Sequence, residues 1–159
     1  MSAFDAIISK ALVAKSPASR TPFPDVAPSR RRNMAAIKRK NTKPEKLVRS
    51  TLHQLGYRFR VDASDLPGRP DLVFPRKKIA IFVHGCFWHN HGACSAGRVP
   101  ATRREYWAPK LLRNSERDTR NLTALRQQGW SVYVLWECEL RDQSWLKLLS
   151  GILGSPRTM

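Results

Sequence analysis

Acidic residues are scarce in this chain, and their scarcity sets the first limit on its function. Asp and Glu together number 12 against 29 Lys and Arg, which leaves a formal net charge of +17. This excess is larger than solubility requires, and it favours a polyanionic partner. The basic residues are spread along the chain without a basic helix backed by an apolar stripe, so a nucleic acid is favoured over a membrane. A merely solvated basic surface is the alternative.

Cysteine and long apolar runs are also in short supply. The three cysteines are odd in number, and Cys86 and Cys94 flank a histidine, which favours metal ligation in a reducing compartment over disulfide bonds. No run of about 18 or more apolar residues is present, so no membrane-spanning helix is expected. Residues 3–14 lack the compact apolar centre and cleavage site of a secretory signal. We therefore expect a cytoplasmic protein.

The length of the chain and its proline distribution predict one domain preceded by a tail. The 159 residues with 42% hydrophobic content are enough for a single core. Residues 1–28 contain Ser-Pro, Thr-Pro, Phe-Pro and Ala-Pro pairs, which predict a flexible tail. Residues 29–155 are expected to form a basic arm plus the folded domain. The arm, with basic runs at 30–32 and 38–40, is expected to order against phosphates, and a solvated linker is the alternative.

Hydrophobic periodicity predicts a mixed α/β sheet with helices on its faces. The predicted elements in chain order are helix 44–55, strands 57–61, 71–74 and 79–83, helix 103–128, strand 130–136, and a final helix that Asp142 caps and that runs through Leu149 or Leu153. The run at 79–83 is apolar throughout, which predicts a central strand. The helix that joins it to 130–136 predicts a right-handed parallel crossover.

A carboxylate and a histidine-rich loop are expected to meet at one end of this sheet. Asp71 heads one strand, and the neighbouring strand 79–83 leads into 84–94, which holds three histidines and two cysteines. Hydrolysis of a phosphodiester near neutral pH needs a hard cation, for which Asp71 is the candidate ligand and the main-chain carbonyl of Val83 a second one. An ordinary turn residue is the alternative for Asp71.

Three further side chains are candidates for roles in catalysis. His84 and His89 suit acid, base or phosphate-contact roles because imidazole titrates near about pH 6.5, although either could instead bind zinc. Glu45 lies in the first turn of helix 44–55, where a carboxylate complements the helix dipole. Orientation of a water molecule at the active site is the functional alternative for Glu45.

Cysteine and histidine residues indicate a second metal site, and aromatic residues indicate a surface that stacks on nucleic-acid bases. Cys86, His91, Cys94 and Cys138 make a complete set of four ligands, which is typical of structural zinc, and buried free thiols are the alternative. Exposed aromatic side chains beside cations can stack on bases or wedge between them. The candidates are Phe87 and Trp88 in the loop, and Trp107 after the basic Arg103, although helix-core packing is an alternative for Trp107.

The motif HGCFWH at residues 84–89 carries a resemblance to a known family. Together with LPGRPD at 66–71, VPATR at 99–103 and WEC at 136–138, it resembles the very-short-patch mismatch repair endonucleases, over about residues 31–141. The resemblance implies a restriction-endonuclease-like mixed central sheet with a structural zinc, and magnesium as the catalytic cofactor. It implies a nick in one strand 5′ to the thymine of a T:G mismatch produced by deamination of 5-methylcytosine. Double-stranded DNA with such a mismatch is then the substrate, other mismatch-repair proteins are candidate partners, and a monomer is expected.

The resemblance also assigns roles to individual residues. It makes Asp71 and the carbonyl of Val83 magnesium ligands, His89 and His84 catalytic, and Glu45 an assisting carboxylate. It assigns zinc to Cys86, His91, Cys94 and Cys138, and DNA contacts to Phe87, Trp88, Trp107, Arg69 and Arg103. Two other hypotheses stay open, a zinc-stabilised DNA-binding protein lacking nuclease activity and a nuclease that cuts undamaged DNA. The presence of Asp71, His84 and His89 together favours an enzyme, because a DNA-binding protein needs no acid–base set.

Overall fold

The computed structural model describes residues 27–29, 32, 36 and 40–156, and the fold below concerns 40–156. The predicted tail and most of the predicted basic arm lie outside the described residues. In the described part of the chain, no helix has both the length and the apolar character that a bilayer crossing requires.

Helix α2, Lys43–Gln54, confirms the predicted helix 44–55. Its N-cap is Thr42, whose Oγ1 accepts a hydrogen bond from the Glu45 amide at 3.4 Å, and a proline occupies the first turn, where no amide is needed. Val48 and Leu52 are fully buried against the sheet. The helix therefore fixes its first turn, including Glu45, relative to the core.

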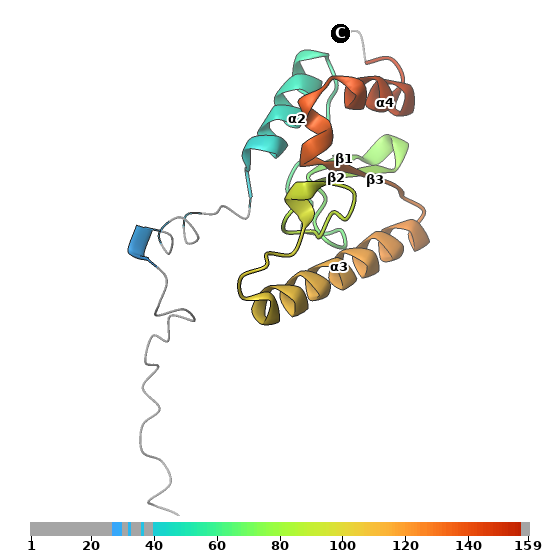
Figure 1. The fold of residues 1–159 in the computed structure, drawn as a ribbon. Helices are drawn as coiled ribbons and strands as arrows, with labels where there is room; N and C mark the ends of the chain where they lie inside the picture. Colours follow the sequence, from blue (N-terminus) through green and yellow to red (C-terminus); the bar gives the residue numbers. More distant parts are fainter. Residues whose placement is uncertain (1–26, 30–31, 33–35, 37–39, 157–159) are drawn as a thin grey trace, which may run out of the picture. The chain divides into compact units, whose positions relative to one another are not determined.

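The sheet has three strands in the order β1-β2-β3 (Figure 1). Strand β1, Leu72–Phe74, is antiparallel to β2, Ile79–His84, which is parallel to β3, Ser131–Trp136. The 3₁₀ helix η2, Pro75–Lys77, joins β1 to β2. All residues of β2 are buried, because this strand has a neighbour on each edge and helices over both faces. The central strand and the parallel pairing are thus confirmed.

The predicted strand 57–61 is wrong, and the sheet has one strand fewer than expected. Only Arg60 pairs with β1, through two backbone hydrogen bonds with Val73 at 2.8 and 2.9 Å. The start of the segment is held elsewhere, since the Tyr57 hydroxyl donates to the Gly154 carbonyl at 2.7 Å. Asp62 has a φ of 55°, which turns the chain away from the strand direction. The segment therefore pairs with the sheet through the backbone of one residue only.

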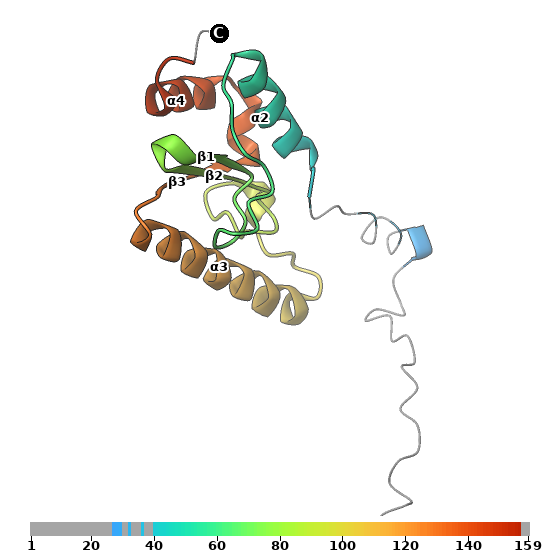
Figure 2. The same ribbon diagram turned by 180° about the vertical axis from the view of Figure 1, so that it is seen from behind.

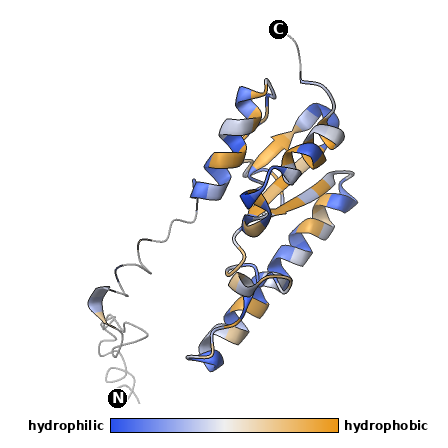
Figure 3. Cartoon of the chain, turned by 45° about the horizontal axis from the view of Figure 1, so that its top comes forward, coloured by the Kyte–Doolittle hydropathy of each residue, from blue (hydrophilic) through white to orange (hydrophobic). Residues whose placement is uncertain are grey.

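Helices cover the sheet on both faces. Helices α2 and α4, Ser144–Leu153, lie over one face, and α3, Arg104–Gln127, lies over the other (Figures 1 and 2). Side chains of β2 alternate between the two layers, so that Ile81 packs in the core under α2 and α4 while Phe82 packs against α3. Hydrophobic residues accordingly concentrate in the strands, and hydrophilic ones prevail along α3 (Figure 3).

Two details concern the helices that flank β3. Leu111 of α3 is fully buried while Leu112 is 56% exposed, because adjacent helix positions point about 100° apart. The final helix begins at Ser144, and Asp142 lies just before it, as a capping residue does. Its Oδ1 accepts the Ser144 amide at 2.9 Å, which satisfies an amide at the start of α4.

Candidate active site and metal centre

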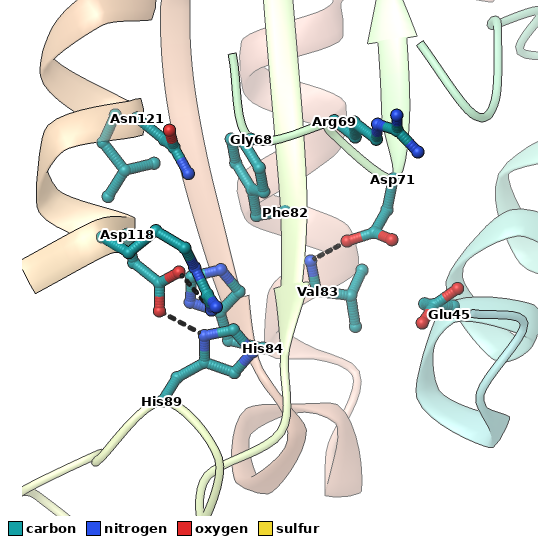
Figure 4. A pocket seen from close by; sticks show the side chains of 12 residues that line it. Glu45, Gly68, Arg69, Asp71, Phe82, Val83, His84, His89, Asp118 and Asn121 are labelled. Carbon is teal, nitrogen blue, oxygen red and sulfur yellow. Dashed lines mark hydrogen bonds and ion pairs between the residues drawn. The ribbon is translucent and has the colours of Figure 1, made fainter. Parts of the chain in front are cut away.

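A pocket of about 210 Å³ lies at the end of β2, and residues from α2, the start of β1, β2, the loop after it and α3 line it. Two groups of side chains face it, with β2 running between them (Figure 4). The carboxylate side holds Glu45, Asp71 and Val83, and the imidazole side holds His84, His89 and Asp118. The expected meeting of the acid with the histidine-rich loop is confirmed.

The backbone of β2 fixes Asp71 on the carboxylate side. The Asp71 amide donates to the Ile81 carbonyl at 3.0 Å, and its Oδ2 accepts the Val83 amide at 2.7 Å. Burial raises the pKa of Asp71 to about 6 against the lowering effect of the Val83 hydrogen bond, and the charge of Glu45 adds to the rise. A bound cation would favour the ionised form of such a carboxylate.

Glu45 is at once a capping residue and a wall of the pocket. Its carboxylate accepts the Asn41 amide at 2.8 Å and the Thr42 hydroxyl at 2.9 Å, so it stabilises the start of α2. Only 5% of the residue is exposed, and the pocket lies beside it. Glu45 therefore does cap α2, and its place beside the pocket also suits the alternative role of orienting a water molecule.

The carboxylate side suits a hard divalent cation. Asp71 offers Oδ1, the oxygen that the Val83 amide leaves free of its hydrogen bond, and Glu45 adds a second buried carboxylate nearby. Mg²⁺ prefers one or two carboxylates together with other oxygen ligands, and none of the described residues that line this side of the pocket offers a sulfur ligand. The oxygen ligands present thus fit magnesium.

The imidazole side is built from two stacked rings and an acid. The rings of His84 and His89 lie parallel, with centroids 3.7 Å apart and an interplanar angle of 8°. His89 Nδ1 lies 2.5 Å from Asp118 Oδ2. Because an ionised carboxylate only accepts hydrogen bonds, Nδ1 carries the proton and Nε2 remains for chemistry in the pocket.

Burial and charge set the protonation of this group. Burial, together with the smaller effect of the neighbouring His89, lowers the pKa of His84 to about 4, so His84 is neutral at pH 7. Burial alone would raise the pKa of Asp118, but the hydrogen bond and the electrostatic attraction to His89 outweigh it and lower that pKa. Asp118 is therefore an anion that can orient His89.

Asp118 was missed at the sequence level. It lies in the middle of a helix rich in charged residues, where an acid is ordinary. Its position does carry a signal, because Leu111 and Leu125 lie seven residues to either side and both are fully buried. Positions seven apart share a helix face. Asp118 could thus have been predicted as an acid that shares a helix face with two core leucines.

The four residues predicted to bind zinc converge. Ligand atoms of Cys86, His91, Cys94 and Cys138 all lie within 4.8 Å of one another, and His91 Nδ1 is 3.4 Å from the Cys138 sulfur. Zn–S bonds of about 2.3 Å in a tetrahedral site place sulfurs about 3.8 Å apart. A set of three thiols and one imidazole at this separation fits a closed structural metal site.

The loop reaches this geometry through a tight backbone contact. Residues 95–97 form the 3₁₀ helix η3, Ser95–Gly97, and a Cβ on Gly97 would lie 2.0 Å from the His91 carbonyl oxygen. Cys138 comes from η4, Glu137–Arg141, directly after β3. Trp136 is half-buried and stacks on His91 with centroids 4.1 Å apart, and its ring meets that of His84 edge to face. Trp136 therefore packs against both the Cys/His centre and the imidazole side of the pocket.

The predicted DNA-contacting residues divide between two places. Phe87, Trp88 and Trp107 are half-buried and pack edge to face with centroids 5.0 to 6.0 Å apart, outside the pocket lining. Arg103 begins α3 in a left-handed conformation with φ 56°. Arg69 instead lines the pocket (Figure 4). The three aromatic residues are thus gathered on one cluster, as a stacking surface requires.

The mixed sheet, the carboxylate side, the oriented imidazole and the basic chain together fit a hydrolase that acts on a phosphodiester. Comparison with known proteins specifies which one. The sequence profile described as "DNA mismatch endonuclease Vsr" matches residues 25–95. The chain belongs to this family of DNA mismatch endonucleases, and it is therefore a DNA endonuclease with DNA as its partner. The hypothesis of a DNA-binding protein without nuclease activity is not supported.

Relatives from three bacteria carry this assignment. The chain is 53% identical over 118 residues to "Type II nicking enzyme V.XorIIP" of Xanthomonas oryzae pv. oryzae, covering 74% of this chain and 86% of that protein. It is 46% identical over 115 residues to "DNA mismatch endonuclease Vsr" of Escherichia coli, covering 72% and 73%. It is 46% identical over 116 residues to "Type II nicking enzyme V.NaeI" of Lentzea aerocolonigenes, covering 69% and 68%.

Proposed function

We propose that this endonuclease nicks one DNA strand 5′ to the thymine of a T:G mismatch formed by deamination of 5-methylcytosine, with magnesium as its cofactor. The observation that carries the proposal is that Asp71 and the oriented His89 face one pocket from the two sides of β2. The E. coli relative is named as a DNA mismatch endonuclease, and other relatives are named as nicking enzymes, which supports cutting of one strand at a mismatch.

The carboxylate side is the proposed magnesium site. Asp71 and the main-chain carbonyl of Val83 would hold Mg²⁺, which polarises the scissile phosphate and offsets charge on the leaving oxygen. Glu45 is proposed to orient the attacking water from its place in the first turn of α2. Its hydrogen bonds to the start of the helix keep this carboxylate in one position.

The imidazole side is proposed to move the proton. Asp118 holds the Nδ1 proton of His89, so that Nε2 can exchange a proton with the attacking water or the leaving oxygen. His84 is neutral and stacks against His89, which restricts the tilt of the catalytic ring. His84 is proposed to contact the phosphate as a neutral hydrogen-bonding group. Zn²⁺ at the Cys/His centre is proposed to be structural.

The remaining contacts are proposed to position the DNA. Arg69 at the pocket and Arg103 at the start of α3 would neutralise phosphates. Phe87, Trp88 and Trp107 would insert beside the mismatch, where an unstable base pair makes unstacking least costly. We further propose that the three-stranded sheet is the core of a restriction-endonuclease-like fold and that the protein acts as a monomer.

A pair of matched duplexes tests this function. One contains T:G and the other C:G at the same candidate methylation site, each strand carries its own end label, and Mg²⁺ is present. We expect a nick only in the T strand, 5′ to the mismatched thymine, and only in the first duplex. Equal cutting of both duplexes would instead indicate a nuclease for undamaged DNA. Cutting of the mismatch with Mg²⁺ omitted would contradict the cofactor.

A further inference from the structure

Arg49 lies behind the carboxylate side of the pocket, and no motif in the sequence marked it. It projects from the middle of α2 and keeps only 20% of its side chain exposed. Its Nη2 is 3.2 Å from Glu45 Oε2 and 3.6 Å from Asp71 Oδ1, and its Nη1 donates to Asn41 Oδ1 at 2.8 Å. One guanidinium therefore pairs with both carboxylates of the proposed magnesium site.

The oxygen of Asp71 that faces Arg49 is the one that a cation needs. Asp71 Oδ2 accepts the Val83 amide at 2.7 Å, which leaves Oδ1 as its principal ligand atom. A magnesium ion binds a carboxylate oxygen at about 2.0–2.1 Å. The guanidinium and the ion would then sit close to the same oxygen, and two positive groups at that separation repel each other.

We propose that Arg49 stands in for the divalent cation when the site is empty of it and weakens the affinity of the site for that cation. The inference rests on the proposed function, because it takes Asp71 as the magnesium ligand. Without a positive group, Asp71 and Glu45 would repel each other, and the Arg49 guanidinium offsets that repulsion. Cation binding must then push the guanidinium away from Asp71.

The surroundings of Arg49 are compatible with such a movement. The contact with Asp71 is an ion pair at 3.6 Å, longer than a hydrogen bond, whereas the bond from Nη1 to Asn41 is short. Nε is buried without a hydrogen-bond partner among the described residues, so the observed rotamer does not satisfy every donor. The side chain can thus leave Asp71 while Asn41 and Glu45 still hold it.

This role predicts two effects of opposite sign when the charge is removed. Arg49→Met keeps an apolar stem and deletes the guanidinium. Without the divalent cation, the variant should unfold at a lower temperature than the wild type, because the two carboxylates lose their counter-charge. Its affinity for the cation should nevertheless rise, since the competing charge is gone. Removal of a residue that merely supports the fold would lower both the unfolding temperature and the affinity for the cation.

Binding of Mn²⁺ alone, followed by the EPR signal of the free ion, measures the affinity directly. The full chain is used without DNA, with its Cys/His centre saturated with Zn²⁺. We expect Arg49→Met to bind Mn²⁺ about 3- to 10-fold more tightly than the wild type, a change of about 0.6–1.4 kcal/mol. Arg126→Met, at the exposed end of α3, removes the same charge far from the site in the sequence and should leave the affinity unchanged.

Asp71→Asn separates a failure of this inference from a failure of the proposed function. If Asp71→Asn binds Mn²⁺ as the wild type does, Asp71 is not the ligand and the proposed site is wrong. If Asp71→Asn loses binding while Arg49→Met binds as tightly as the wild type or more weakly, only the role of Arg49 is overturned. Should Arg49→Met fail to fold, Arg49→Lys replaces it. The shorter, compact ammonium of lysine cannot span both carboxylates, so Arg49→Lys should again bind Mn²⁺ more tightly than the wild type. Equal or weaker binding of Mn²⁺ by this variant overturns the inference.

Discussion

The two sides of the pocket are assembled in different ways. On the imidazole side, His89 is held directly by Asp118 at 2.5 Å and by the parallel ring of His84. On the carboxylate side, Asp71 and Glu45 are held by backbone amides, and their mutual repulsion is offset by Arg49. The two sides thus rely on different supports: side chains hold the imidazole that is proposed to transfer the proton, whereas backbone amides and a guanidinium hold the carboxylates that are proposed to bind the cation.

The alternation of side chains at the end of β2 separates the two sides of the pocket. Successive residues of β2 point to opposite faces of the sheet, so Val83 lies toward the carboxylates while His84 lies toward α3. A shift of one residue in the pairing of β2 would exchange these faces. The burial of Ile81 and Phe82 on opposite sides of the sheet fixes the register, and with it the placing of both sets of groups.

The largest effect is expected on the carboxylate side, from Asp71→Asn. This change removes the charge that the cation needs while keeping the size of the side chain. Because metal ions contribute several kcal/mol to such reactions, nicking of a T:G duplex should fall by at least about 1,000-fold. DNA binding, measured by gel mobility shift without Mg²⁺, should remain close to that of the wild type. A parallel loss of binding would mean that Asp71 supports the DNA interface instead.

The matching change on the imidazole side is His89→Ala. Loss of a general acid or base typically lowers the rate by about 10²- to 10⁴-fold, and we expect a single-turnover nicking rate in that range. His53→Ala, in an exposed histidine at the end of α2, is the control and should nick at the wild-type rate. If His89→Ala cut as fast as this control, proton transfer would have to be assigned to another group.

A smaller effect is expected from Asp118→Asn, which leaves His89 in place but removes its anionic partner. The carboxamide can present its N–H to Nδ1 and so favour the wrong tautomer. We expect nicking to slow by about 10- to 100-fold, less than for loss of the imidazole itself. Proton NMR of the His89 ring checks the cause, because the low-field Nδ1 proton resonance should disappear in the variant. An unchanged resonance with an unchanged rate would show that Asp118 orients nothing.

The smallest effect is expected in the loop that carries His91 and Cys94, from Gly97→Ala, which acts on stability and not directly on the reaction. A methyl group there meets the His91 carbonyl at 2.0 Å, so the loop must shift, at a cost of about 1–3 kcal/mol in unfolding free energy. Gly92→Ala is the matched control, since its Cβ meets nothing within 4 Å, and it should change stability by less than about 0.5 kcal/mol. Zinc content and thermal unfolding are measured together. Equal zinc content and equal stability of the two variants would contradict the role given to this loop.

The sequence predicted those features that depend on local patterns. The apolar run of β2 indicated a buried central strand, and the types and spacing of the Cys/His residues indicated one set of ligands, which the fold brings together. Strand 57–61 failed because its alternating pattern does not show that Tyr57 is tied to the end of α4. Asp118 and Arg49 look like ordinary charged residues on helices, and only the packing of α3 and α2 against the sheet places them at the pocket.

A magnesium titration of single-turnover nicking tests most directly whether both sides serve one reaction. The substrate is a T:G duplex with the T strand labelled, and wild type and Asp118→Asn are compared. No nick should form without added Mg²⁺, and Asp118→Asn should have a lower maximal rate with the same half-saturating Mg²⁺ concentration, because it alters only the imidazole side. Nicking without a divalent cation, or a variant whose Mg²⁺ requirement shifts while its maximal rate does not, would contradict the division of labour between Asp71 and His89.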